Sequence, residues 1–237
     1  MLRSSIPALL VCASCGLPPG EHTSTTVESA ITGSTYAVRT FVPDGAPKDA
    51  PLLVVLDGDW HAVPAFLEAA DDAHEPVIVL SVGYEDGNER VRDYTPTTVA
   101  AYPDSGGLDA FARALEEEIL PVAPGTSTER IWFGHSLGGV AVTYLWLQRP
   151  DLVSTAIVAS PAAYWDDGLL IDMAATTSHD GEVFVSVGGQ EGWGLPALAS
   201  ALAHELDAPF VEYPGREHTG TIAPSLRDGL LHLLERQ

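Results

Sequence analysis

The residues best suited to chemistry lie in the run Gly134-His135-Ser136-Leu137-Gly138. Apolar residues typical of a buried strand precede it at 131–133, and residues typical of an apolar helix follow at 140–147. A Gly-x-Ser-x-Gly run between a strand and a helix is typical of a nucleophile elbow, in which the serine hydroxyl projects from a strained turn above the sheet. Both glycines fit this turn, since side chains at 134 and 138 are expected to collide with neighbouring backbone. The sequence therefore predicts that Ser136 is a nucleophile.

A serine nucleophile needs a base, and position in the chain favours His218 among the eight histidines. His218 follows the last predicted strand, and Glu191 follows an earlier one, so that serine, acid and histidine come in the order typical of α/β-hydrolases. The imidazole would take the serine proton, and the carboxylate would orient the imidazole and stabilise its charged form. Two alternatives for the acid stay open, namely Asp166 or Asp167 in place of Glu191, and a Ser–His dyad without an acid.

Backbone N–H groups are expected to stabilise the oxyanion of an acyl-transfer reaction. One donor is predicted at Leu137, directly after the nucleophile, and the other at Asp59, in the turn after the apolar run 51–56. A metal site at Asp57, Asp59 and His61 is the alternative for this turn. No further ligand set accompanies those three residues, so neither a metal nor another cofactor is predicted.

The order of elements predicts an α/β fold. Runs typical of strands alternate with stretches of helical periodicity, which implies a mostly parallel central sheet with helices on both faces. In such sheets reactive groups gather at the carboxyl ends of the strands. The expected strands are 35–42, 51–56, 76–82, 131–133, 155–159, 182–187 and 210–213, and the expected helices are 63–72, 108–120, 140–147, 195–206 and 223–236.

Composition and the N-terminal residues bear on partners and location. The 237 residues carry a formal net charge of -22, which disfavours binding to nucleic acid or to an anionic membrane through a basic surface. Residues 1–15 resemble a signal peptide with a bacterial lipoprotein cleavage box ending at Cys15, 16–26 read as a tether, and 27–237 as one hydrolase domain. We expect an exported protein, lipid-anchored through Cys15 to the bacterial cell envelope or periplasmic. Plain secretion and a cytoplasmic chain are the alternatives, and oligomeric state is not predicted.

Six motifs together resemble the putative esterase family of α/β-hydrolases, over residues 27–235. Relatives in that family include siderophore (enterobactin) esterases, feruloyl esterases, S-formylglutathione hydrolases and mycolyltransferases. The motifs are Leu56-Asp57-Gly58-Asp59, Arg90-x-Arg92-Asp93-Tyr94-Thr95-Pro96, Gly134-His135-Ser136-Leu137-Gly138-Gly139, Ser160-Pro161-x-x-Tyr164-Trp165, Gly188-x-x-Glu191 and Gly215-x-x-His218.

The resemblance implies a serine carboxylic-ester hydrolase that forms an acyl-enzyme on a small-molecule ester, with a siderophore or aryl ester as the leading substrate. It places Arg92 and Trp165 beside the substrate, although an ion pair with Asp93 and plain packing are the respective alternatives. Few basic residues lie near the predicted site, which disfavours a polyanionic catecholate. An acyltransferase using the same serine and histidine, and a non-catalytic lipoprotein binding module, are the alternative functions.

Overall fold

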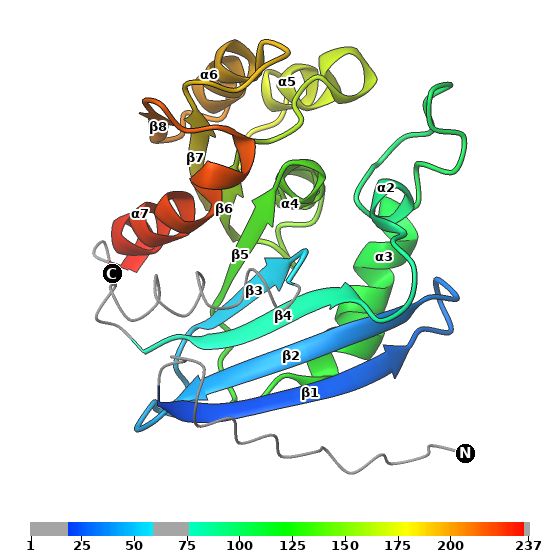
Figure 1. The fold of residues 1–237 in the computed structure, drawn as a ribbon, viewed down its shortest axis with the longest axis vertical. Coiled ribbons are helices and arrows are strands. Elements are labelled where there is room, and N and C mark those ends of the chain that lie inside the picture. The colour runs from blue at the N-terminus through cyan, green and yellow to red at the C-terminus, as the bar shows by residue number, and fades with distance from the viewer. Residues whose placement is uncertain (1–18, 59–75, 235–237) are drawn as a thin grey trace.

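The computed structural model describes residues 19–58 and 76–234, which form one twisted sheet with helices on both faces (Figure 1). Within the described residues the sheet has eight strands in the order β1-β2-β4-β3-β5-β6-β7-β8. The strands from β4 to β8 along this order run parallel, while β1 and β2 form an antiparallel edge. The bounds are β1 Gly20–Glu28, β2 Thr35–Pro43, β3 Leu52–Leu56, β4 Ile78–Tyr84, β5 Arg130–His135, β6 Thr155–Ala159, β7 Glu182–Gly188 and β8 Phe210–Tyr213.

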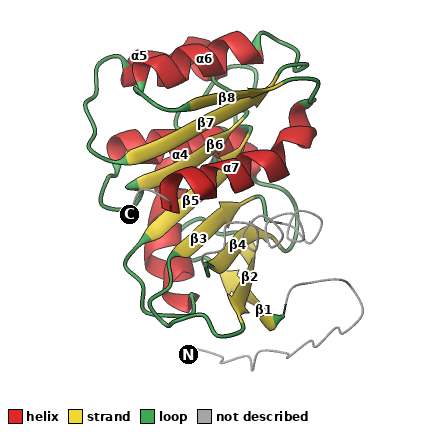
Figure 2. Cartoon of the chain, turned by 90° about the vertical axis from the view of Figure 1, so that its left-hand side faces the viewer, coloured by secondary structure: helices red, strands yellow, loops and turns green. Residues whose placement is uncertain are grey.

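The helices divide between the two faces of this sheet. Helices α3, α4, α5 and α6 contribute to one core, and α7 covers the other face over β6 and β7 (Figure 2). The bounds are α2 Arg90–Asp93, α3 Leu108–Ala114, α4 Leu137–Gln148, α5 Leu169–Ala174, α6 Leu195–Glu205 and α7 Ile222–Leu234, and a π-helical stretch, Leu115–Ile119, extends α3. The expected α/β-hydrolase fold is confirmed. The helix expected over 63–72 lies outside the described residues.

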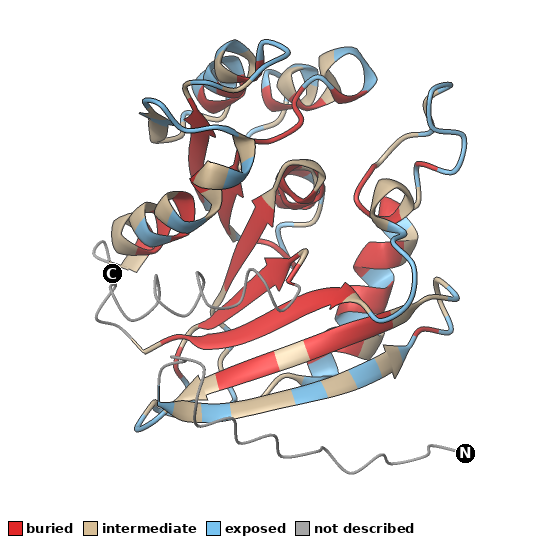
Figure 3. Ribbon diagram, viewed as in Figure 1, coloured by how far each residue is buried: buried red, intermediate tan, exposed pale blue. Residues whose placement is uncertain are grey.

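Strand β3 explains why the central strands read as continuous apolar runs. Leu52, Val54 and Leu56 pack into the core under α3 and α4, whereas Leu53 and Val55 pack into the core under α7. Because helices cover both faces, neither set of alternating positions meets water, and the central strands are buried along their length (Figure 3).

The tether expected over 16–26 is wrong from Gly20 onward, since Gly20–Glu28 forms β1. This strand pairs along its whole length with β2, from Gly20 opposite Pro43 to Glu28 opposite Thr35. It is the edge strand of the sheet and pairs with β2 on one side. Its residues are half-buried or exposed (Figure 3). Polar Thr, Ser, His and Glu side chains are tolerated at such an edge, so the segment has the composition of a linker although it belongs to the sheet.

The predicted leader 1–15 and Cys15 lie outside the described residues. Across 19–58 and 76–234, no helix is both long and apolar enough to span a bilayer.

Candidate active site

The parallel strands deliver polar residues to one edge of the sheet, at their carboxyl ends. Gly58 follows β3, Ser136 follows β5, Ser160 follows β6, Glu191 follows β7 and His218 follows β8. This arrangement agrees with the rule that sites of open parallel sheets lie outside the carboxyl ends of the strands.

Ser136 occupies a strained turn between β5 and α4. Its backbone has φ 60° and ψ -116°, a left-handed region that non-glycine residues rarely adopt. Hydrogen bonds hold the turn: the Ser136 N–H donates to Ala159 O at 3.1 Å, and the Ser136 carbonyl accepts from the N–H groups of Val140 and Ala162, each at 3.1 Å. The geometry is that of the predicted elbow.

The glycines around the turn differ in how much space a side chain would have. A Cβ at Gly134 would lie 2.1 Å from Gly138 O, so residue 134 must lack a side chain, as predicted. The same prediction is wrong for Gly138, where a Cβ would make an ordinary 3.4 Å contact with the Asp57 side chain. The tight second position is Gly139, at which a Cβ would lie 3.1 Å from Pro161 Cα.

His218 and Glu191 form a short hydrogen bond, with 2.5 Å between Nδ1 and Oε2. An ionised carboxylate can only accept, so Nδ1 carries the proton and Nε2 is left as the basic nitrogen. The Glu191 side chain is fully buried, whereas that of His218 is 39% exposed. The acid is thus sheltered and the base is reachable by substrate.

Further donors keep the buried Glu191 ionised. Its Oε1 accepts from Ser160 Oγ at 2.5 Å and from the Gly188 N–H at 2.6 Å. Burial acts to raise the pKa of Glu191, but the hydrogen bonds from Ser160, His218 and Gly188 outweigh it and hold the pKa below its usual value.

The backbone of His218 is fixed as firmly as its ring. The His218 carbonyl accepts from His135 Nε2 at 2.9 Å and from Thr221 Oγ1 at 2.7 Å, and Thr221 Oγ1 lies 2.9 Å from Ser160 Oγ. Burial, followed by the nearby His218, lowers the pKa of His135 to about 4. His135 is therefore neutral at ordinary pH and donates a hydrogen bond to the backbone of the loop that carries His218.

A pocket of about 230 Å³ opens over this cluster. Ser136, Glu191 and His218 line it together with Tyr164 and Trp193. The three residues predicted as nucleophile, acid and base are therefore gathered at one cavity. Glu191, rather than Asp166 or Asp167, is the carboxylate that contacts His218.

Of the two predicted oxyanion donors, Leu137 lies within the described residues and Asp59 does not. Leu137 is the first residue of α4, and the leading N–H groups of a helix have no partner within it. Asp59 lies outside the described residues, as does His61 of the metal alternative. No metal-binding group of three or more His, Cys, Asp or Glu residues occurs within the described parts of the chain.

The turn that leads toward Asp59 is held by the loop after β4. Asp57 has φ 60°, its N–H donates to Tyr94 Oη at 3.2 Å, and its carboxylate accepts from Arg90 Nε at 3.1 Å and Nη2 at 2.6 Å. The next residue, Gly58, accepts at its carbonyl from Ser81 Oγ at 2.7 Å and Arg39 Nη1 at 2.9 Å. Arg90 and Tyr94 of the Arg-x-Arg-Asp-Tyr motif thus hold Asp57, while Ser81 and Arg39 hold Gly58.

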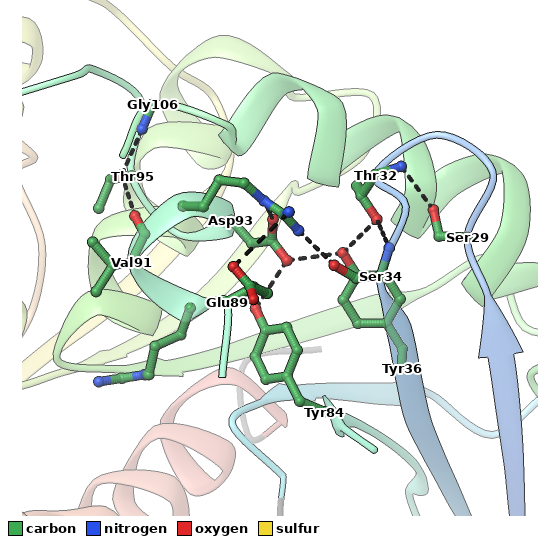
Figure 4. A network of polar contacts seen from close by, with 12 residues as sticks. Ser29, Thr32, Ser34, Tyr36, Tyr84, Glu89, Val91, Asp93, Thr95 and Gly106 are labelled. Carbon is green, nitrogen blue, oxygen red and sulfur yellow. Dashed lines mark hydrogen bonds and ion pairs between the residues drawn. The ribbon is translucent and has the colours of Figure 1, made fainter. Parts of the chain in front are cut away.

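Arg92 is bound to Asp93 and Ser34 and does not contact the pocket. Asp93 is fully buried and accepts from Tyr36 Oη at 2.8 Å, Tyr84 Oη at 3.0 Å and Arg92 Nε at 2.8 Å (Figure 4). The Arg92 Nη2 donates to Ser34 Oγ at 2.6 Å. Of the two interpretations of Arg92, the structure supports the ion pair with Asp93, and Arg92 does not line the Ser136 pocket.

Trp165 lies beside the pocket but does not line it. It is 4% exposed, its Nε1 donates to Thr97 Oγ1 at 3.2 Å, and its ring stacks on Tyr102 with 5.8 Å between centroids. Trp165 lines a neighbouring cavity together with Asp166 and Asp167.

Comparison with known proteins identifies the family. The model of the family described as "Putative esterase" matches residues 29–207. The chain belongs to this family.

Three individual proteins illustrate what the chain is similar to. Ferri-bacillibactin esterase BesA of Bacillus subtilis is 29% identical over 114 residues, 40% of this chain, and the match spans only 39% of BesA. Enterobactin and salmochelin hydrolase IroE is 27% identical with a TM-score of 0.72, covering 90% of this chain and 95% of IroE. The BES protein of Bacillus cereus shares the fold at 23% identity and a TM-score of 0.78, over 89% and 94% of the two chains.

Three residues of this esterase-family site were not predicted as site residues from the sequence. Ser160, Thr221 and His135 bind the acid or the base loop, as described above. Two were visible within motifs, because Ser160 begins Ser-Pro-x-x-Tyr-Trp and His135 precedes the nucleophile. Their hydrogen bonds join residues 31 to 83 positions apart, and no spacing rule predicts such contacts. Thr221 carries no comparable local signal.

Proposed function

We propose that this protein is a serine carboxylic-ester hydrolase that works through an acyl-enzyme on Ser136. The observation that carries the proposal is the shared pocket of Ser136, His218 and Glu191, with Nδ1 of His218 bound to Glu191. Serine, histidine and carboxylate at one cavity supply the nucleophile, the base and the group that orients the base. Membership of the esterase family is consistent with this chemistry.

The first half-reaction forms the acyl-enzyme. His218 Nε2 takes the Ser136 proton as Oγ attacks the ester carbonyl, and the imidazolium then protonates the departing alcohol. Glu191, buried and ionised, fixes the proton on Nδ1 and stabilises the imidazolium by its negative charge. In the second half-reaction water attacks the acyl-serine by the same route, and the carboxylic acid and free Ser136 are released.

The oxyanion of each tetrahedral intermediate would be met by the Leu137 N–H, at the positive end of α4. The second donor is proposed at the Asp59 N–H, beyond the braced turn at Asp57 and Gly58. Loss of one oxyanion-hole donor typically costs about 2.7–4 kcal/mol in transition-state stabilisation.

As the substrate class we propose siderophore or aryl esters. The support comes from the names of the similar proteins, a ferri-bacillibactin esterase and an enterobactin and salmochelin hydrolase. It also comes from the aromatic residues Tyr164 and Trp193, which line the Ser136 pocket and suit a ring-bearing substrate.

The test is hydrolysis of short p-nitrophenyl esters and of a panel of ferric-siderophore esters by the wild type and by Ser136→Ala. We expect Ser136→Ala to lower kcat by at least about 10³-fold, because the nucleophile is lost while the fold is kept. Ser154→Ala is the matched control, as it alters an exposed serine directly before β6, at the opposite edge of the sheet. Equal rates for Ser136→Ala and the wild type would refute the proposal.

A further inference from the structure

A second cavity adjoins the Ser136 pocket. It has a volume of about 410 Å³, and Tyr164 lines both cavities. The Ser136 pocket, at about 230 Å³, has room for only a small part of a larger ester. A substrate that extends past Tyr164 would enter the second cavity, whose lining includes Tyr102, Tyr164, Trp165, Asp166 and Asp167.

Aromatic rings are concentrated around these two cavities. Among the described residues, the exposed large hydrophobic side chains are Tyr102 at 52%, Tyr164 at 41%, Trp193 at 83% and Val122. The three aromatic ones all line one cavity or the other. Tyr164 meets Trp193 edge to face at 5.9 Å, and Tyr102 stacks on the buried Trp165. Single exposed apolar side chains scattered over a surface are normal, whereas a group of them at a cavity is typical of a binding surface.

The charge around the second cavity is negative. Asp166 and Asp167 line it and are exposed, and no Lys or Arg is among the described residues lining either cavity. The undescribed stretch 59–75 contains no Lys or Arg in its sequence. The two arginines of α2 are bound elsewhere, Arg90 to Asp57 and Arg92 to Asp93. An anionic group would therefore meet repulsion from Asp166 and Asp167, and no Lys or Arg among the described lining residues offsets it.

Resting on the proposed ester hydrolysis, we propose that the second cavity is a subsite for a flat, ring-bearing part of the substrate that carries no negative charge. The ring lies against Tyr102 and Tyr164, while the ester carbonyl reaches Ser136. Asp166 and Asp167 select against carboxylate-bearing and other anionic groups, and admit neutral or cationic rings. The acidic surface of the whole chain, with a net charge of -22, acts in the same direction at long range.

The test uses butyrate esters of four alcohols with the same three-carbon spacer. Three end in a phenyl, an N-methylpyridinium or a carboxyphenyl ring, and the fourth is the plain propyl ester. Because the butyryl ester and the three carbons next to the leaving oxygen are the same in each, differences in kcat/KM report on the distal ring. We expect the phenyl and pyridinium esters to exceed the propyl ester by about tenfold, and the carboxyphenyl ester to fall about tenfold below the phenyl ester.

Variants locate the ring. Tyr102→Ala is expected to reduce the advantage of the phenyl ester over the propyl ester to about twofold or less, while hydrolysis of the propyl ester is unchanged. Tyr102→Phe keeps a ring at the same position and is expected to keep the preference. An unchanged preference in Tyr102→Ala would overturn the assignment of the ring to this cavity.

A second pair of variants locates the charge selection. Asp166→Asn with Asp167→Asn should bring the carboxyphenyl ester to within about threefold of the phenyl ester, since the repelling charges are gone. Asparagine suits the left-handed backbone at both positions, where φ is 46° and 55°. The matched control is Asp44→Asn with Asp49→Asn, which makes the same change in net charge in the loop between β2 and β3, at the opposite edge of the sheet.

The outcomes separate the two proposals. Absence of hydrolysis of all four esters would count against the proposed function itself. Hydrolysis of the propyl ester with no ring preference, or with a carboxyphenyl ester as good as the phenyl ester, would overturn only the subsite. In the latter case Arg216, exposed two residues before His218, is the cation to change next, and loss of carboxyphenyl hydrolysis in Arg216→Gln would establish an anion site instead.

Discussion

At Glu191, burial and hydrogen bonding act on the carboxylate in opposite directions, and hydrogen bonding prevails. The side chain has no exposed surface, yet three donors hold its pKa below the usual value. A carboxyl group whose pKa is lowered by folding contributes stability above its ordinary pKa of 4.5, and this contribution is lost as the pH falls through the folded-state pKa. Glu191 therefore remains charged wherever the fold is intact at mildly acidic or neutral pH.

Replacing this charge tests the role of the acid. In Glu191→Gln we expect kcat to fall about 10²–10⁴-fold with little change in KM, because a neutral amide neither fixes the tautomer of His218 nor stabilises its imidazolium. Glu205→Gln, an exposed change at the end of α6, is the control. A rate near that of the wild type would mean that Ser136 and His218 act as a dyad.

The lowered pKa of His135 leads us to expect that the free energy of unfolding depends on pH. Its pKa is about 4 in the folded protein and 6.5 in an unfolded chain, because burial and then the neighbouring His218 disfavour its charge, with Arg90 adding to the effect and Glu191 opposing it. Between those values the unfolded state binds the proton and the folded state does not, so stability falls as the pH is lowered from 7 to 5. The loss attributable to His135 is about 2 kcal/mol.

Urea unfolding at pH 7 and pH 5 measures this loss. His135→Gln cannot titrate but can still donate to the His218 carbonyl, so its stability should fall less than that of the wild type by about 2 kcal/mol over the same interval. The same pH dependence in both proteins would show that His135 is not the titrating group.

At the scale of elements, the passage from β5 into α4 depends on one missing side chain. In Gly134→Ala the new Cβ would lie 2.1 Å from Gly138 O, which is backbone and cannot turn aside. We expect a loss of at least about 3 kcal/mol in the free energy of unfolding, measured by chemical denaturation. Gly192→Ala, where nothing lies within 4 Å of the new Cβ, should change stability by no more than about 0.5 kcal/mol. Comparable losses in the two variants would contradict this account of the elbow.

The loop after β4 acts on catalysis through the turn after β3. Arg90 holds the Asp57 carboxylate with two hydrogen bonds, and that turn leads to the proposed donor at Asp59. In Arg90→Gln we expect kcat to fall about tenfold with KM nearly unchanged, because a small displacement of an oxyanion donor weakens the transition state more than the bound substrate. Arg113→Gln removes an exposed ion pair with Glu117 and should leave both constants unaltered. An effect of Arg90→Gln on KM alone would instead place Arg90 in substrate binding.

For the molecule as a whole, the fold could be predicted where burial leaves a pattern of apolar residues in the sequence. The central strands read as apolar runs because both faces are covered, and the site residues could be placed because each follows such a run. The edge strand Gly20–Glu28 could not be recognised, since a half-exposed strand tolerates the polar residues of a linker. The hydrogen bonds from Arg92 to Ser34 and from Ser160 to Glu191 join residues far apart in the chain, and one-dimensional spacing does not encode such contacts.

The residues, the elements and the fold all place one reactive serine, Ser136, at the centre of the proposed chemistry. One measurement tests the reactivity of this serine most directly. The protein is treated with a fluorophosphonate probe, and intact-mass and fragmentation spectra count and locate the adduct. We predict one adduct per chain, on Ser136, lost in Ser136→Ala and slowed in Glu191→Gln, because only the activated Ser136 Oγ attacks phosphorus at a useful rate. Labelling of Ser136→Ala equal to that of the wild type, or an adduct on a different residue, would contradict the account.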